Sequence, residues 1–408
     1  MADQTFVIVG GGLAGAKAAE TLREEGFDGR VVLLADEVEV PYERPPLSKG
    51  YLLGVEERES AQVHPESWYA EHDVELRLGT PATGLDPSAH EVELGGGERL
   101  RYDKLLLATG SEPRRLDVPG ADLPDVRYLR DLPDADHLRD VLDERHRVAI
   151  VGGGWIGMEV AAAARQHGAD VTLIERGGLP LHTALGDDVA RVFADLHRER
   201  GVDLRLGSGV RQIVGDDDRV VAVVTDDGTE VMADTVVVGI GIRPRTDLGA
   251  AAGLTVEDGI AVDASLRTSD PDIYAAGDVA AVDNPLLGAR VRVEHWANAL
   301  DGGPAAARSM LGQEVSYDRL PFFFTDQYDL GMEYVGHAPP GGYDRVVLRG
   351  DVAGREFQAV WLRDARPVAG MHVNMWDEGI APLEELVRSG RQLDADRLAD
   401  AAVPLADV

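Results

Sequence analysis

The chain has 408 residues, of which 44% are hydrophobic and 28% are charged. This composition is typical of a globular protein with two or three domains. There is no cysteine, which excludes disulfides, thiolate catalysis, iron–sulfur ligation and cysteine-ligated zinc. The formal net charge of -33 indicates a solvated acidic surface and argues against nucleic-acid binding, which needs a basic footprint.

The N-terminal part of the chain reads as a βαβ unit. Residues 6–9 (FVIV) form a short apolar run that is typical of a buried parallel strand. No basic segment precedes this run, and it is too short to cross a membrane, so we expect no signal peptide and a cytoplasmic protein. Helical spacing follows at residues 13–24, and a second strand is predicted at residues 31–35, before Asp36.

The same pattern returns once in the chain. A strand is predicted at residues 148–151, a glycine-rich turn at 152–157, a helix at 160–168 and a strand at 171–174, which ends at Glu175. This recurrence indicates a duplicated fold module and not a solenoid.

The remaining segments favour further strands and a separate C-terminal part. Strands are expected within residues 74–107 and at 202–206, 220–225 and 236–240, with a return crossing at 241–244. In the tail, an antiparallel sheet is expected from residues 322–324, 343–349, 357–362 and 367–371, followed by helices at 382–389 and 394–401. A third domain is therefore expected from about residue 321 onward.

The first glycine-rich turn, residues 10–15 (GGGLAG), matches a dinucleotide-binding fingerprint. Its glycines permit the tight turn, the approach of a pyrophosphate and close helix–strand packing, and the following helix offers its N–H groups to phosphates. Asp36 stands where a carboxylate accepts hydrogen bonds from a ribose diol. The alternative of a purely structural glycine turn is disfavoured by this context.

The second fingerprint, residues 152–157 (GGGWIG), is followed by Glu175 at the end of the next strand. A carboxylate there repels a 2′-phosphate and favours NAD over NADP. The adjacent Arg176 leaves NADPH open, because it is placed to turn towards a 2′-phosphate. Two dinucleotide sites in one chain indicate hydride transfer between a mobile and a resident cofactor.

Several longer segments carry a resemblance to a known family. They are residues 41–49 (PYERPPLSK), 107–110 (LATG), 268–278 (TSDPDIYAAGD) and 324–327 (FTDQ). Together with both fingerprints they resemble the FAD-dependent ferredoxin reductases of bacterial oxygenase systems, the putidaredoxin, rubredoxin and biphenyl-dioxygenase reductase group. The resemblance covers nearly the whole chain.

The resemblance implies the residues that hold each cofactor. For FAD they are Gly10, Gly12, Leu13, Ala14, Gly15, Asp36, Arg44, Lys49, Ala82, Ala108, Thr109, Gly110, Arg130, Gly277, Asp278, Glu294, His295 and Trp296. For NAD they are Gly152, Gly154, Trp155, Ile156, Gly157, Glu159, Glu175, Arg176 and Gly241. No metal site is expected.

Three of these residues are implied to act in catalysis: Lys49, Glu159 and Trp296. Lys49 and Glu159 are expected to pair over the isoalloxazine, which neutralises both charges in a dry site. Trp296 is expected to begin a helix whose positive end faces the flavin pyrimidine edge. Without the flanking motifs, the sequence would favour a structural interpretation of each residue: Lys49 as a surface lysine, Glu159 as an exposed helical glutamate and Trp296 as a core aromatic.

The implied fold is α/β, with two Rossmann-like, doubly wound, glutathione-reductase-like domains and a C-terminal α+β domain. The expected FAD domain comprises residues 1–112 and 244–320, the NAD domain residues 113–243, and the C-terminal interface and ferredoxin-docking domain residues 321–408.

The leading hypothesis for function is an NADH-dependent ferredoxin reductase, in which FAD takes a hydride from NADH and passes single electrons to a small 2Fe–2S ferredoxin that serves a cytochrome P450 or a Rieske dioxygenase. No membrane partner is expected, and the chain is expected to be a monomer or a homodimer.

The family's acidic ferredoxins suggest a basic docking patch on the reductase, whereas this chain is acidic overall. The candidates for a local basic patch are Arg290, Arg292, Arg308 and Arg345. Phe324 stands where relatives have tryptophan.

Two alternatives stay open. The first is another flavoenzyme: an NADH oxidase, or an enzyme like monodehydroascorbate reductase or a quinone reductase. The second is a flavin-loaded interaction protein that resembles apoptosis-inducing factor. A disulfide reductase is excluded, because the chain has no cysteine.

Overall fold

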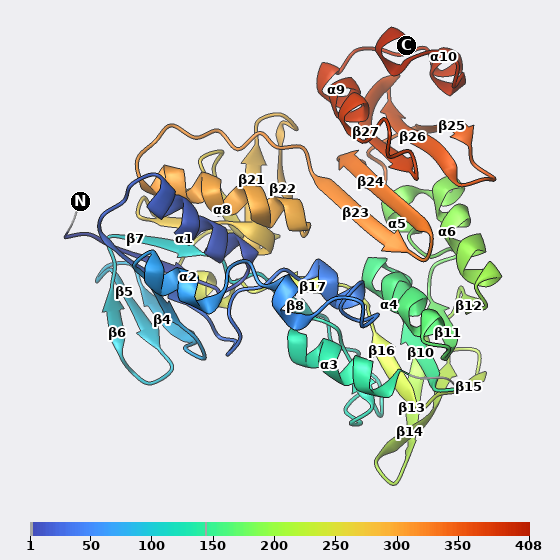
Figure 1. Cartoon of the computed structure of the whole chain (residues 1–408), viewed down its shortest axis with the longest axis horizontal. Helices are drawn as coiled ribbons and strands as arrows, with labels where there is room; N and C mark the ends of the chain where they lie inside the picture. Colours follow the sequence, from blue (N-terminus) through green and yellow to red (C-terminus); the bar gives the residue numbers. More distant parts are fainter. Residues whose placement is uncertain (1–2, 143–144) are drawn as a thin grey trace. The chain divides into compact units, whose positions relative to one another are not determined.

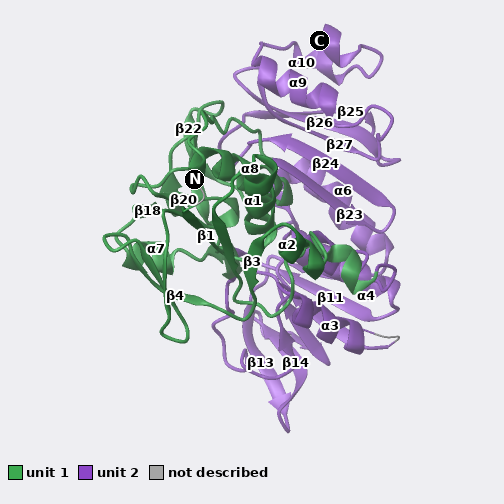
Figure 2. Cartoon of the chain, turned by 60° about the vertical axis from the view of Figure 1, so that its left-hand side comes forward, with its two compact units in different colours: residues 1–44, 57–112, 243–321 green, residues 45–56, 113–242, 322–408 purple. Residues whose placement is uncertain are grey.

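The computed structural model describes residues 3–142 and 145–408, and the chain divides into two compact units (Figure 2). Unit 1 comprises residues 1–44, 57–112 and 243–321, and unit 2 comprises residues 45–56, 113–242 and 322–408. The chain leaves and re-enters unit 1 near the short strands β8 (Ser111–Pro113) and β17 (Ile242–Pro244). Within the described residues, no helix is long and apolar enough to cross a membrane.

Unit 1 is built on a parallel sheet with the strand order β20-β7-β1-β2-β3. Strand β7 of this sheet is labelled in Figure 1. Its strands are β1 (Thr5–Val9), β2 (Arg30–Leu34), β3 (Val74–Arg77), β7 (Lys104–Leu107) and β20 (Ile273–Ala275). Helix α1 (Leu13–Glu24) connects β1 to β2 and has the bounds that the sequence predicts. Helix α8 (Trp296–Met310) packs along α1.

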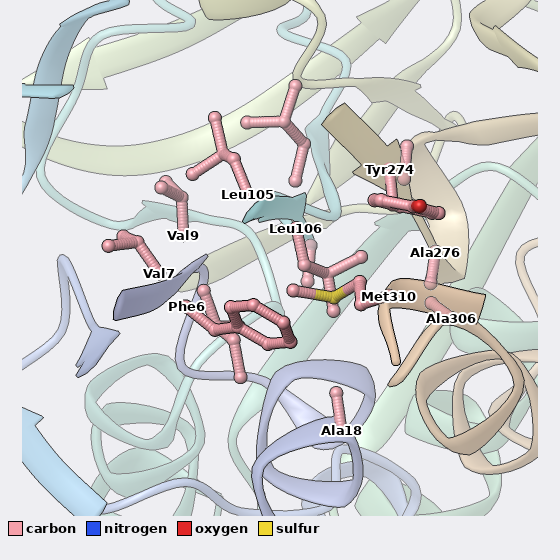
Figure 3. Packing of buried hydrophobic residues seen from close by; sticks show 14 of the residues in the cluster. Phe6, Val7, Val9, Ala18, Leu105, Leu106, Tyr274, Ala276, Ala306 and Met310 are labelled. Carbon is pink, nitrogen blue, oxygen red and sulfur yellow. The ribbon is translucent and has the colours of Figure 1, made fainter. Parts of the chain in front are cut away.

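The rest of unit 1 surrounds this sheet. An antiparallel meander contains β4 (Ala82–Asp86), β5 (Glu91–Leu94) and β6 (Arg99–Arg101), and a second small sheet contains β18 (Val256–Glu257), β19 (Gly259–Val262), β21 (Ala280–Asn284) and β22 (Ala289–Arg292). Short helices are η2 (Arg58–Ala61), α2 (Glu66–Glu71), α7 (Asp247–Ala251) and η3 (Gly277–Val279). Figure 3 shows the core, where Phe6 of β1 and Leu106 of β7 lie near Ala18 of α1 and Met310 of α8. Burial of these apolar side chains holds sheet and helices together.

Unit 2 contains the second parallel sheet, in the order β12-β11-β10-β16-β9. Its strands are β9 (Val126–Arg127), β10 (Arg147–Val151), β11 (Asp170–Glu175), β12 (Asp203–Leu206) and β16 (Thr235–Val238). The helices and turns are η1 (Pro45–Ser48), α3 (Leu132–Val141), α4 (Trp155–Gln166), α5 (His182–Leu185) and α6 (Asp187–Glu199). A meander of β13 (Val210–Asp216), β14 (Arg219–Thr225) and β15 (Glu230–Met232) adjoins it, and aspartates occupy the turn after β13.

The C-terminal part of unit 2 is an antiparallel sheet in the order β23-β24-β27-β26-β25. Its strands are β23 (Phe322–Gln327), β24 (Leu330–Gly336), β25 (Arg345–Asp351), β26 (Glu356–Arg363) and β27 (Arg366–Val373), followed by α9 (Ala381–Ser389), α10 (Ala395–Ala399) and η4 (Leu405–Asp407). Met332 and Trp361 of this sheet share one hydrophobic cluster with Met158 of α4 and Phe193 of α6. This shared core explains why residues 113–242 and 322–408 form one compact unit.

Several elements differ from the sequence-based expectation, and three of them are instructive. Helix α4 begins at Trp155 and not at residue 160, because the last fingerprint glycine, Gly157, is part of its first turn. Strand β24 was not predicted; it is buried along both faces, with Glu333 alone half-buried, so its sequence shows no alternation. Helix α6 was also not predicted, although its apolar residues keep a helical spacing on one face.

Candidate functional site

The glycine loop of unit 1 leaves no room for larger side chains at two of its positions. Gly10 has φ of +126°, and a Cβ there would lie 2.1 Å from the carbonyl oxygen of Ala108. A Cβ on Gly15 would lie 2.0 Å from the carbonyl oxygen of Gly10. A Cβ on Gly12 would meet no described atom within 4 Å. The loop is therefore tight against the sheet and open towards the N-terminus of α1, which is the cradle that a pyrophosphate requires.

The glycine loop of unit 2 repeats this geometry. Gly152 has φ of +107°, and its Cβ would lie 2.3 Å from the carbonyl oxygen of Gly239. A Cβ on Gly157 would lie 2.1 Å from the carbonyl oxygen of Gly152. Gly154 is the N-cap residue of α4, and a Cβ there would come no closer than 3.9 Å to the carbonyl oxygen of Gly239. The residues present therefore fit a second dinucleotide.

The segment that contains Gly277 and Asp278 packs against the first glycine loop, at Ala14. Gly277 has φ of +75°, and its Cβ would lie 3.2 Å from the Cβ of Ala14. Gly303 of α8 sits even closer, because its Cβ would lie 2.3 Å from the carbonyl oxygen of Ala14. Small residues at these places bring α1, α8 and η3 together beside the glycine loop.

Charged side chains next to this loop form a connected set. Arg44 donates to Glu37 at 2.7 Å and to the Tyr42 hydroxyl at 3.2 Å. Burial opposes the charge on Arg44, but Tyr42, Glu37 and Asp278 outweigh it and raise the pKa of Arg44. Asp36 is exposed two residues after the end of β2, and its carboxylate lies 3.5 Å from the guanidinium of Arg245. Arg44 thus remains a cation, which suits phosphate binding.

The start of α8 carries Trp296, as predicted, and His295 is its N-cap residue. The indole Nε1 of Trp296 donates to Glu43 at 2.9 Å. Burial raises the pKa of the neighbouring Glu294, and Asp278 adds to this effect while the ion pair with Arg292 opposes it. The helix N-terminus is therefore held by contacts to its side chains, with its dipole available to a bound group.

In unit 2, Glu175 is fixed by two backbone donors. Its Oε2 accepts from the amide of Gly153 at 2.6 Å, and its Oε1 accepts from the amide of Gly177 at 2.6 Å. This bidentate hold places a carboxylate beside the second glycine loop, where a ribose diol is recognised. Arg176 is exposed, and its Nε would lie 2.8 Å from a Cβ on Gly209.

Lys49 and Glu159 form an ion pair within unit 2, with 2.7 Å between Nζ and Oε1. The Glu159 side chain is only 2% exposed, and that of Lys49 is 16% exposed. Glu159 also accepts from the hydroxyls of Thr325, at 2.6 Å, and of Ser48. A buried carboxylate needs this number of donors to offset the loss of water.

The neighbours of this pair extend to β23. The Nζ of Lys49 lies 5.2 Å from the ring centroid of Phe324, so Phe324 lies beside the ion pair. Burial raises the pKa of Asp326, with Glu159 adding to it and Lys49 opposing it. In the adjacent first turn of α4, the ring of Trp155 packs at a tilt against that of Phe323, with 4.4 Å between the ring centroids.

The other predicted residues lie in several places. Ala82 begins β4 in unit 1. Thr109 and Gly110 follow β7, where the Thr109 hydroxyl donates to the Arg245 carbonyl at 2.8 Å. Arg130 precedes α3 in unit 2, and its backbone amide donates to Asp134. Gly241, also in unit 2, has φ of +97°.

Four buried residues around Glu159 or its partners lie outside the residues that the sequence predicts for the site: Ser48, Thr325, Gln327 and His197. A signal was present in the sequence. Thr325 and Gln327 stand two residues apart in an apolar strand, so both point to one face.

Comparisons with known proteins agree with this geometry. Residues 4–303 match the family described as pyridine nucleotide-disulphide oxidoreductase, and residues 322–408 match the family described as reductase C-terminal. The chain belongs to the pyridine nucleotide-disulphide oxidoreductase family. Since it has no cysteine, the redox disulfide in the family's name has no counterpart in this chain.

Individual relatives match along nearly the whole chain. A ferredoxin reductase subunit of 5,5'-dehydrodivanillate O-demethylase from a Sphingobium species is 41% identical, covering 98% of this chain and 97% of the relative. Putidaredoxin reductase of Pseudomonas putida is 36% identical, and the match covers 100% of this chain and 97% of the relative. The crystal structure of a covalent putidaredoxin reductase–putidaredoxin complex matches with a TM-score of 0.96 and 36% identity. This match covers 100% of this chain and 98% of the chain in the complex.

These matches confirm the resemblance and the α/β fold that the sequence predicts. They also confirm the expectation of an oxidoreductase that uses FAD and a nicotinamide nucleotide.

Proposed function

We propose that this protein is the reductase component of an oxygenase system, which takes a hydride from NADH and delivers single electrons to a 2Fe–2S ferredoxin. The observation that carries the proposal is the pair of glycine cradles, one in each unit, each followed by a carboxylate at the end of the next strand. Two relatives support it: one from Sphingobium that is named as the ferredoxin reductase subunit of an O-demethylase, and one that is named as putidaredoxin reductase.

FAD supplies the chemistry that no side chain here provides, because a flavin accepts a hydride and releases single electrons. In unit 1, the proposed binding residues are Gly10, Gly12, Leu13, Ala14, Gly15, Asp36, Arg44, Ala82, Ala108, Thr109, Gly110, Gly277, Asp278, Glu294, His295 and Trp296. Lys49 and Arg130 of unit 2 complete the proposed set. The uncapped first turn of α1 and the Arg44 cation stabilise phosphate charge.

The proposed nicotinamide site is in unit 2, at Gly152, Gly154, Trp155, Ile156, Gly157, Glu159, Glu175, Arg176 and Gly241. The two amides that hold Glu175 prevent its carboxylate from rotating away from the loop. A 2′-phosphate would place two negative groups side by side, so NADH is the preferred donor.

Lys49 and Glu159 are proposed to serve hydride transfer as a neutral, fixed pair. Their near-complete burial removes water from that part of unit 2. A preorganised ion pair in a dry site stabilises a developing charge without rearranging. Trp296 contributes through the N-terminus of α8, which its backbone begins.

The finer organisation belongs to the same proposal. The chain is proposed to act in the cytoplasm, as a monomer or homodimer, with no nucleic-acid partner. The division into an FAD domain (1–112, 244–320), an NAD domain (113–243) and a docking domain (321–408) is retained as a functional division.

The arginines considered for ferredoxin docking all have carboxylate neighbours. Arg290 is paired with Asp283 and Glu257, Arg292 with Glu294, Arg308 with Glu25, and Arg345 lies 3.8 Å from Asp396. An acidic partner would have to compete with these carboxylates. The docking surface therefore stays a prediction.

The test is anaerobic reduction of the purified yellow holoprotein by NADH, followed by addition of candidate ferredoxins with cytochrome c as final acceptor. The proposal predicts rapid bleaching of the flavin and cytochrome c reduction that depends on the ferredoxin. Rapid NADH consumption that needs oxygen or a quinone and ignores every ferredoxin would favour the other flavoenzymes. Slow bleaching with a stable charge-transfer band would favour an interaction protein.

A further inference from the structure

The carboxylate of Glu159 is the end of a buried line of hydrogen bonds that starts on another helix. His197 of α6 contacts the Gln327 side-chain oxygen through Nε2 at 2.9 Å. The Gln327 amide nitrogen donates to the Thr325 hydroxyl oxygen at 3.2 Å. Thr325 in turn donates to Oε1 of Glu159 at 2.6 Å. All four residues belong to unit 2.

The line has one direction. Because the Gln327 nitrogen donates to Thr325, its oxygen is the acceptor for His197, so Nε2 of His197 must carry the hydrogen. Burial lowers the pKa of His197 to about 4, so the ring is neutral near pH 7 and its Nδ1 carries no hydrogen. Within residues 3–142 and 145–408, that Nδ1 has no hydrogen-bond partner. Every hydrogen in the line therefore points towards Glu159.

The burial of these side chains requires a reason. Thr325, Gln327 and His197 each have 0% exposure, where apolar residues would pack without the penalty of desolvating polar groups. Thr325 and Gln327 share one face of β23 with Phe323, which packs against Trp155 in the first turn of α4. The same strand face thus meets both the second glycine loop and Glu159.

We propose that Thr325, Gln327 and His197 are positioning residues, which fix the Glu159 carboxylate and, through it, the ammonium of Lys49 for hydride transfer. This inference rests on the proposed function. Without Thr325, Oε1 of Glu159 keeps only Lys49 among the partners described here, and the carboxylate gains freedom to rotate about its long side chain. The segment that matches the reductase C-terminal family then has a part in the reaction besides any role in docking.

The experiment uses the FAD-loaded protein and three variants. Thr325→Val removes the hydroxyl and keeps the shape of the side chain, whereas Thr325→Ser keeps the hydroxyl. Thr235→Val is the matched control, because Thr235 is another buried threonine of unit 2 that is hydrogen-bonded to a histidine, His146, at the opposite end of β16 from the second glycine loop. The rate of flavin bleaching at saturating NADH is measured by anaerobic stopped flow, and the Kd for NAD+ by titration.

We expect Thr325→Val to slow bleaching by about tenfold to a hundredfold, since misplacing a positioned group by about 1 Å has effects of that size. The Kd for NAD+ should change by less than about threefold, because Thr325 acts on geometry and not on affinity. Thr325→Ser should restore the rate, and Thr235→Val should leave it as in the wild type. An unchanged rate in Thr325→Val, with or without a lower unfolding temperature, would overturn the proposal.

A second readout needs no NADH. In ¹⁵N-histidine-labelled holoprotein, assigned with His197→Gln, the two ring nitrogens of His197 should report the neutral form protonated at Nε2. A ring protonated at Nδ1 would overturn the direction of the line. If the wild type is not reduced by NADH at all, the proposed function fails, while the tautomer still decides whether the line exists as drawn.

Discussion

The burial of His197 makes the stability of the protein depend on pH. The His197 ring has 0% exposure, and burial lowers its pKa from 6.5 to about 4, while the hydrogen bond with Gln327 opposes this shift. In the unfolded chain the ring takes up a proton below pH 6.5, whereas in the folded protein it stays neutral down to about pH 4. The unfolded state therefore binds more protons in this window, and stability falls as the pH falls.

The magnitude follows from the two pKa values. The full shift corresponds to about 3 kcal/mol, of which about 2 kcal/mol is lost between pH 7 and pH 5. The comparison protein is His197→Gln, which keeps a side-chain amide donor and does not titrate. Other titrating groups affect both proteins alike, so their contributions cancel in the difference.

The assay is urea unfolding of both FAD-saturated proteins at several pH values, followed by circular dichroism. The free energy of unfolding of the wild type, minus that of His197→Gln, should decrease by about 2 kcal/mol from pH 7 to pH 5. A difference that stays constant over this range would refute the reasoning, as would an NMR titration of His197 with a midpoint near 6.5.

Three further predictions concern the cofactor sites. Glu175→Ala with Arg176 retained should shift the ratio of kcat/KM values towards NADPH, because the carboxylate that repels a 2′-phosphate is gone; an unchanged ratio would count against this role. Asp278→Ala should lower the FAD content of the purified protein, measured from the ratio of flavin to protein absorbance, and full occupancy would contradict the assignment. Gly157→Ala places a Cβ 2.1 Å from the Gly152 carbonyl oxygen and should weaken NAD+ binding by at least about tenfold while FAD content is kept. Equal NAD+ titrations in variant and wild type would show that this loop does not bind the nucleotide.

Local patterns predicted the parts of the fold whose signals lie close together in sequence. The bounds of α1 were correct, because its apolar spacing begins directly after three consecutive glycines and ends at polar residues. The start of α4 was missed, because Gly157 is a poor helix former and its place in the helix is set by the close approach of its Cα to the Gly152 carbonyl. The fully buried β24 shows no alternation, so its sequence resembles many other apolar segments.

Only those site residues that belong to a recognisable sequence motif could be predicted. The pairing of Lys49 with Glu159 was expected from the resemblance, and the structure brings the two together. The contribution of Thr325 and His197 was not foreseen, because their hydrogen bonds join distant parts of the sequence. Thr325 lies 166 positions from Glu159, and His197 lies 130 positions from Gln327. Such contacts depend on how β23 packs against α4 and α6, which no local pattern encodes.

The central claim, electron delivery from NADH through FAD to a ferredoxin, is tested most directly by one anaerobic experiment. The holoprotein is mixed with NADH and an oxidised 2Fe–2S ferredoxin, and the ferredoxin absorbance is followed against a reaction that lacks the reductase. We predict that two ferredoxins are reduced for each NADH consumed, since a hydride carries two electrons. Full bleaching of the flavin with every tested ferredoxin left oxidised would contradict it.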